Sequence, residues 1–151
     1  MINIQLDQKP ISVSIRYNAY YKVVLLLAII ESCGYAKKAS LDLIHIVFWS
    51  LRNETNYQVL LDLANQNRDT LIPWTFEHGI DEVLALGLIN GYIDRVIVGQ
   101  TLEIKVTEKG REIINAINQF ELFRDEIQKI KSLGKIPKNR LNNANKNWKL
   151  L

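Results

Sequence analysis

The sequence predicts a mainly α-helical α+β domain with one small β-hairpin. Most of the chain carries apolar residues at the three- and four-residue spacing of amphipathic helices, with short polar breaks between these segments. One stretch near residue 100 instead alternates apolar and polar residues around a Gly-Gln turn, which is typical of a hairpin. The composition of the 151 residues, 48% hydrophobic and 23% charged, is that of one globular domain.

The N-terminal part is expected to contain an arm and a central helix. Residues 1–17 are the arm, and residues 11–17 alternate in the manner of a short strand. Asn18 is a suitable N-cap for a helix that should end at Gly34. Because this helix is apolar almost all round between its ends, we expect it to lie in the centre of the core.

Three further helices are expected before the hairpin. Ser40 and Asn53 are suitable N-caps for the second and third helices. A polar loop follows over residues 65–69. Thr75 is the expected N-cap of the fourth helix, which should extend from Phe76 to Leu88.

The expected hairpin lies directly between two expected helices. The string Val83-Leu84-Ala85-Leu86-Gly87-Leu88-Ile89 precedes the hairpin over residues 91–106, and Thr107-Glu108-Lys109-Gly110 follows it. Thr107 is the expected N-cap of the last helix. This order resembles a winged helix, in which a β-hairpin directly follows a helix. We therefore expect a winged helix-turn-helix domain over residues 18–134, with a long first helix and a long last helix that ends at Gly134.

The helix before the hairpin is poorly suited to reading DNA. A reading helix offers Arg, Lys, Asn or Gln side chains to base edges, and basic residues nearby neutralise phosphates. The expected helix has no Arg or Lys and carries Glu77, Asp81 and Glu82, which would repel a phosphate backbone. These carboxylates form either a solvated face or an acidic face for a basic protein partner.

Positive charge is concentrated at the C-terminus. The net charge is +3, yet residues 1–128 hold 12 basic and 16 acidic residues, whereas residues 129–151 hold seven basic residues and no acidic one. We interpret residues 135–151 as a basic, Asn-rich tail that is solvated, docks on an acidic protein surface, or contacts nucleic acid non-specifically. The candidate contact residues are Lys129, Lys131, Lys135, Lys138, Arg140, Lys146, Trp148 and Lys149.

The sequence contains no catalytic, cofactor-binding or metal-binding motif that we can identify. Cys33 has no second cysteine, and His45 and His78 fall on different expected helices, so a Cys-His nucleophile has no support. We expect no enzyme activity, cofactor or metal. The start of the sequence does not read as a signal peptide, and the longest apolar run, Val23 to Ile30, is too short to span a membrane, so we expect a cytoplasmic protein.

Several segments together resemble a known family. They are the apolar helix Tyr20 to Ile30, Ala39-Ser40-Leu41-Asp42-Leu43-Ile44, Leu71-Ile72-Pro73, Gly79 to Ile89, and Thr107-Glu108-Lys109-Gly110. Over about residues 17 to 118 the chain resembles the middle component of bacterial ABC-three-component systems, which include the Lamassu anti-phage defence systems.

The resemblance implies a function without catalysis. Such a subunit binds an SMC-like ATPase and an effector, which is often a nuclease, and couples the sensing of foreign DNA to the effector. We therefore expect a winged-helix adaptor that has no membrane partner and contacts DNA indirectly or through the basic tail. The alternative is a winged-helix transcriptional regulator that forms a dimer through its first and last helices and binds DNA as that dimer.

Overall fold

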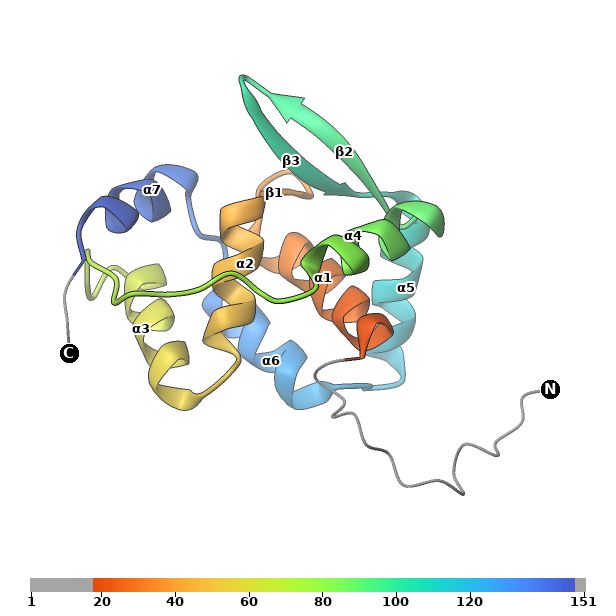
Figure 1. Cartoon of the computed structure of the whole chain (residues 1–151). Coiled ribbons are helices and arrows are strands. Elements are labelled where there is room, and N and C mark those ends of the chain that lie inside the picture. Colours follow the sequence, from red (N-terminus) through yellow and green to blue (C-terminus); the bar gives the residue numbers. More distant parts are fainter. Residues whose placement is uncertain (1–17, 149–151) are drawn as a thin grey trace.

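The structure is a computed structural model and describes residues 18–148 (Figure 1). The expected arm over residues 1–17, with its strand, and the candidate contact residue Lys149 lie outside the described residues. The fold is α+β, as the sequence predicts, with mostly helices and one small antiparallel sheet. In chain order the elements are α1 (Ala19–Cys33), β1 (Lys38–Ser40), α2 (Leu41–Ser50), α3 (Glu54–Ala64), α4 (Ile80–Ile89), β2 (Ile93–Val98), β3 (Thr101–Val106), α5 (Glu108–Gln119), α6 (Arg124–Leu133) and α7 (Lys138–Lys146).

Helix α1 lies at the centre of the fold, as expected (Figure 1). The side chain of Asn18 caps it by accepting hydrogen bonds from the backbone N–H groups of Tyr20 and Tyr21. Gly34 is its C-cap, and glycine is required there because a Cβ atom would lie 2.1 Å from the carbonyl oxygen of Lys38. No helix within residues 18–148 combines the length and apolar character that crossing a bilayer requires.

The three strands form a sheet in the order β1-β3-β2. Strands β2 and β3 pair from Ile93 opposite Val106 to Val98 opposite Thr101, so the two-residue turn is at the expected Gly-Gln position. The hairpin projects from the helical body (Figure 1). Strand β1, which the sequence did not reveal, adds Ala39 opposite Ile104. Three residues are too few for an alternating pattern to be recognised.

Four of the expected helix caps, Asn18 among them, are confirmed, and one is wrong. Ser40, Asn53 and Thr107 each accept a hydrogen bond from a backbone N–H group in the first turn of α2, α3 and α5. Thr75 does not cap α4, which begins only after Gly79. Arg52 binds the hydroxyl of Thr75 at 2.6 Å and the carbonyl oxygen of Phe76 at 2.9 Å, and these bonds hold the segment in a non-helical conformation.

The expected long last helix is two helices, α5 and α6. Between them Glu121 and Phe123 have left-handed backbone, with φ values of 54° and 52°. The backbone N–H of Leu122 bonds the carbonyl oxygen of Ile117 at 3.0 Å, a pattern that closes a helix. The ring of Phe123 packs edge-on against Tyr21 at 5.0 Å between ring centroids, so the break allows α6 to turn back onto α1.

The C-terminal segment is folded as far as the structure describes it. Ile136, Leu141 and Ala144 are buried, and the backbone N–H of Leu71 bonds the carbonyl oxygen of Asn147 at 3.1 Å. Helix α7 forms because its apolar residues Leu141 and Ala144 are three positions apart and share one face. A solvated tail, one of the three interpretations of residues 135–151, therefore does not describe residues 136–147.

Candidate functional site

Helix α4 presents an outward face that is acidic and apolar. Ile80, Val83 and Gly87 are buried, and a Cβ atom at Gly87 would lie 2.9 Å from the Ile93 side chain, so α4 packs closely on the start of the hairpin. The outward positions are Asp81, Glu82, Ala85 and Ile89, and 80% of Ile89 is exposed.

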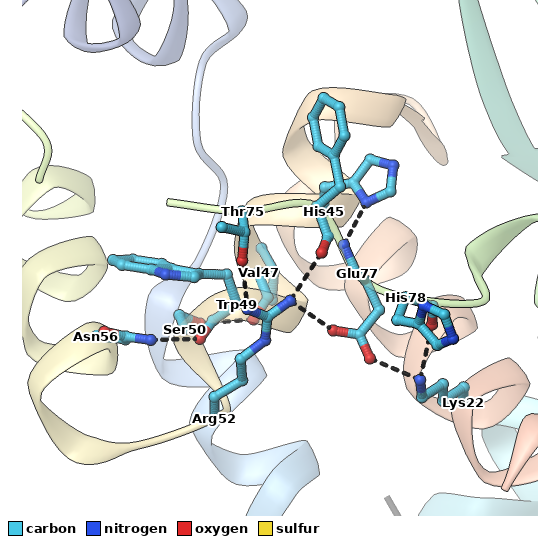
Figure 2. Close-up of polar contacts among 11 residues, drawn as sticks. Lys22, His45, Val47, Trp49, Ser50, Arg52, Asn56, Thr75, Glu77 and His78 are labelled. Carbon is cyan, nitrogen blue, oxygen red and sulfur yellow. Dashed lines mark hydrogen bonds and ion pairs between the residues drawn. The ribbon is translucent and has the colours of Figure 1, made fainter. Parts of the chain in front are cut away.

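Glu77 does not belong to this face, contrary to the sequence-based expectation. It precedes the helix and is buried, with 5% of its side chain exposed. Its Oε2 atom lies 2.7 Å from Nζ of Lys22 on α1, and its Oε1 atom lies 3.2 Å from Nη2 of Arg52, which follows α2 (Figure 2). The Lys22 ammonium also donates to the carbonyl oxygen of His78 at 3.0 Å. The carboxylate therefore joins α1 and α2 to the segment that leads into α4.

His45 completes this buried polar cluster. Its Nδ1 atom accepts a hydrogen bond from the backbone N–H of Glu77 at 2.9 Å (Figure 2). The ring of Phe76 packs over the imidazole, with 4.5 Å between ring centroids. Burial lowers the pKa of His45 below its ordinary value, with nearby Asp42 and Glu77 opposing the shift. A neutral imidazole suits the bond, because only an unprotonated nitrogen accepts a hydrogen bond. The cluster fixes the entry into α4 and leaves Asp81 and Glu82 as the helix's exposed carboxylates.

Most of the basic candidate residues are engaged within the chain. Lys129 pairs with Glu54 at 2.9 Å, and Lys138 pairs with the buried Glu103. The remaining donors bind neutral oxygens. Lys131 binds Asn118 Oδ1, Lys135 binds the carbonyl oxygens of Glu31 and Gly34, and Arg140 binds the carbonyl oxygen of Ala64. Lys146 is exposed at the end of α7.

Trp148 lies against the body, and 51% of it remains exposed. It forms a parallel β-bridge with Leu71, and its indole N–H donates to the carbonyl oxygen of Asn145. Asn145 also accepts a hydrogen bond from the indole N–H of Trp74 at 2.9 Å. The two tryptophans therefore join α7 to the segment between α3 and α4.

The described residues form several hollows, one of which has Lys131 and another Arg140 in its lining. An apolar hollow of about 220 Å³ separates α1 from α5 and α6; it is lined mainly by aliphatic residues, with Glu31 and Lys131 at its edge. A larger polar hollow of about 540 Å³ lies between the loop after α3 and α7. It is lined by Leu63, Gln66, Asn67, Arg68, Asp69, Arg140 and Asn143.

The side chains that could support catalysis or bind a metal are dispersed in the described residues. The thiol of Cys33 is fully buried 3.7 Å from the carbonyl oxygen of Ile130, and burial raises its pKa to about 12. A thiol with that pKa is almost entirely protonated near neutral pH and is a poor nucleophile. Residues 18–148 contain no group of three or more His, Cys, Asp or Glu side chains that could bind a metal ion.

Sequence reasoning missed Lys22, Arg52 and Arg68. Lys22 and Arg52 are separated from Glu77 by more than twenty residues along the chain, and nothing local marks them as its partners. The one signal for the polar hollow was composition, because the loop after α3 and the C-terminal segment both contain several Asn residues and one Arg. No family model, no curated protein and no solved structure matches the chain.

Proposed function

We propose that this chain is a non-catalytic winged-helix adaptor that binds protein partners through the outward face of α4. The partners that the sequence resemblance implies are an SMC-like ATPase and an effector of a bacterial ABC-three-component defence system. The observation that carries the proposal is the chemistry of this face: Asp81, Glu82, Ala85 and Ile89 offer carboxylates and aliphatic groups, and α4 contains no basic or amide side chain.

Two features of the fold support the winged-helix interpretation. Helix α4 ends at Ile89 and strand β2 begins at Ile93, so the hairpin follows α4 after three residues. The sheet order β1-β3-β2 places β1, the strand before α2, against the second strand of the hairpin. A winged helix has this combination of a helix, a following hairpin and a third short strand from an earlier part of the chain.

The face of α4 suits protein better than DNA. Asp81 and Glu82 are exposed, and carboxylates would repel the phosphates on either side of a major groove. Ile89 is the most exposed large apolar side chain of the described residues. Burying it against an apolar surface of a partner would be favourable, because apolar area is removed from water. A partner with a basic rim and an apolar contact complements both groups.

The adaptor proposal is tested by expressing the chain with the proteins encoded by adjacent genes and purifying the complex. We expect stable co-purification of the wild type, and loss of at least about 90% of the bound partner for the double variant Glu82→Lys, Ile89→Ser, because a central interface contact is worth about 2 kcal/mol or more. The matched control is Glu112→Lys on α5 together with Phe120→Ser at its C-cap, which likewise reverses one exposed charge and replaces one exposed apolar side chain by serine.

Two outcomes would contradict the proposal. In one, the chain purifies alone as a dimer and protects a specific operator from nuclease digestion, which is the behaviour of the alternative regulator. In the other, the α4 double variant and its control retain the partner equally well, so that binding does not involve α4.

A further inference from the structure

Two segments that are far apart in the sequence form one polar surface. The loop after α3 and helix α7 meet around the hollow of about 540 Å³. We call this surface, with the exposed Lys146 and Trp148 at the end of α7, the α7 surface. Its defining side chains are Arg68, Arg140, Asn143, Lys146 and Trp148.

The two arginines of the α7 surface are held in place and still have donors to offer. Arg140 donates from Nη1 to the carbonyl oxygen of Ala64 at 3.1 Å, and Arg68 donates from Nε to the carbonyl oxygen of Thr70 at 2.8 Å. A guanidinium group has five N–H donors, so each arginine keeps several for a ligand. A fixed guanidinium with free donors is suited to the oxygens of a phosphate, which it binds through two parallel hydrogen bonds.

The charge of the α7 surface is the opposite of that of α4. Helix α7 contains no carboxylate, and its outward positions include Asn139, Asn142 and Asn143 together with Lys146. Asp69 is the one carboxylate among the residues that line the hollow. Amides and basic groups are the side chains that contact phosphates, sugars and base edges.

Trp148 adds an aromatic face at the edge of this surface. Its backbone bridges to Leu71, three residues after Arg68, so residue 148 lies beside the segment that follows that arginine. The hydrogen bond from its indole N–H to Asn145 anchors the ring while half of it stays exposed. An anchored, exposed tryptophan beside basic groups is the combination with which proteins bind single strands, because unpaired bases stack on the ring while phosphates contact the basic groups.

We propose that the α7 surface binds single-stranded nucleic acid. Arg68 and Arg140 contact phosphates at the hollow, Lys146 adds positive charge, and Trp148 stacks against a base. This inference is independent of the adaptor function, because it uses none of the residues of α4. It also assigns a role to Trp148, which the packing of the body leaves half exposed.

The test measures fluorescence anisotropy of a labelled 20-nucleotide oligothymidine, with a duplex of the same length as the comparison probe. We expect the single strand to bind more tightly than the duplex. Trp148→Ala should weaken binding by about tenfold, the typical effect of removing one stacking residue. Arg140→Gln should weaken binding by a similar factor and reduce the slope of log affinity against log salt concentration by about 0.7 for each phosphate that is no longer neutralised.

The matched control is Arg95→Gln on strand β2, an exposed arginine whose replacement changes the net charge by the same amount. Because Arg140 and Trp148 also make contacts within the chain, Asn143→Asp provides a second variant at an exposed position of the hollow. Asn143→Asp should weaken binding with no loss of thermal stability. The proposal is overturned if oligothymidine does not bind at low salt, if Arg95→Gln weakens binding as much as Arg140→Gln, or if Asn143→Asp and Trp148→Ala both bind as the wild type does.

Discussion

Replacing Glu77 by glutamine should destabilise the fold strongly, because this carboxylate is the centre of a buried ion-pair cluster. The substitution keeps the shape of the side chain and removes its charge. Glu77 has 5% of its side chain exposed and Lys22 has 6%, and the two charged groups lie 2.7 Å apart. Arg52 contributes a second, more exposed cation at 3.2 Å.

The expected magnitude follows from the burial of the pair. Removing one partner of a buried ion pair costs about 3–5 kcal/mol, because the other charge then loses its compensation in a medium of low polarity. A domain of this size has a total free energy of unfolding of about 5–15 kcal/mol, so the variant should lose a large part of its stability. The matching fall in melting temperature is about 6–20 °C for a chain of about 150 residues.

Urea unfolding at neutral pH, followed by the fluorescence of the tryptophans, measures this change. Glu121→Gln is the control, because Glu121 forms an exposed ion pair with Arg124 that should be worth at most about 1 kcal/mol. A second comparison is the double variant Lys22→Met, Glu77→Met. Replacing both charges by apolar groups is often nearly neutral, so we expect it to be more stable than Glu77→Gln. A destabilisation by Glu77→Gln no larger than that by Glu121→Gln would refute the reasoning.

Three further predictions concern other buried residues. Burial lowers the pKa of His45, so the unfolded chain takes up a proton near pH 6.5 and the folded chain does so only at a lower pH. The free energy of unfolding should therefore fall as the pH drops below about 6.5. Urea titrations at several pH values should show a smaller decline for His45→Gln than for the wild type. Cys33, with its pKa raised to about 12, should react with a thiol reagent at pH 8 only after denaturation, and rapid labelling of the native protein would contradict its burial. Gly110→Ala should destabilise the protein, because the new Cβ atom would lie 2.3 Å from the carbonyl oxygen of Tyr92. Helix propensity alone predicts the opposite, since alanine is the better helix former by about 1 kcal/mol. A higher melting temperature for Gly110→Ala would refute the steric argument.

Local chemistry explains which elements could be predicted from the sequence. The caps at Asn18, Ser40, Asn53 and Thr107 depend only on a side chain and the backbone two or three residues ahead, so the sequence contains all the needed information. The hairpin was equally local, because its turn and its alternating residues are contiguous. Each of these predictions involves residues separated by only a few positions.

The incorrect predictions all involve interactions between distant segments. Thr75 has the chemistry of an N-cap, but Arg52 takes its hydroxyl, and Glu77 is drawn into the core by Lys22. The break after α5 depends on Phe123 packing on Tyr21, a partner about one hundred residues earlier in the chain. The spacing of residues along the sequence does not reveal that Arg52, Lys22 or Tyr21 will lie next to these segments.

The candidate sites follow the same division. The acidic character of α4 was evident from the sequence, since Asp81 and Glu82 belong to one short helix, whereas the exposure of Ile89 was not. The α7 surface was not, because Arg68 and Arg140 are brought together only by the packing of α7 on the body. The basic character of the C-terminal segment was evident from the sequence. Which of its basic side chains form ion pairs with carboxylates of the body was not.

The ion pairs of the C-terminal segment change how its positive charge is interpreted. Lys129 and Lys138 pair with Glu54 and Glu103, so part of the positive charge of the C-terminal segment is neutralised by acidic residues of the body. Within residues 18–148, the candidate residues Lys131, Lys135, Arg140 and Lys146 form no such ion pair with a carboxylate, and Arg140 and Lys146 are the two that belong to the α7 surface.

The two proposed surfaces therefore differ in charge, negative at α4 and positive at α7, and each suits a different class of partner. If the two assignments are right, Glu82→Lys should affect only the protein partner and Arg140→Gln only the oligonucleotide. Variants that each affected both would show that one surface performs both tasks.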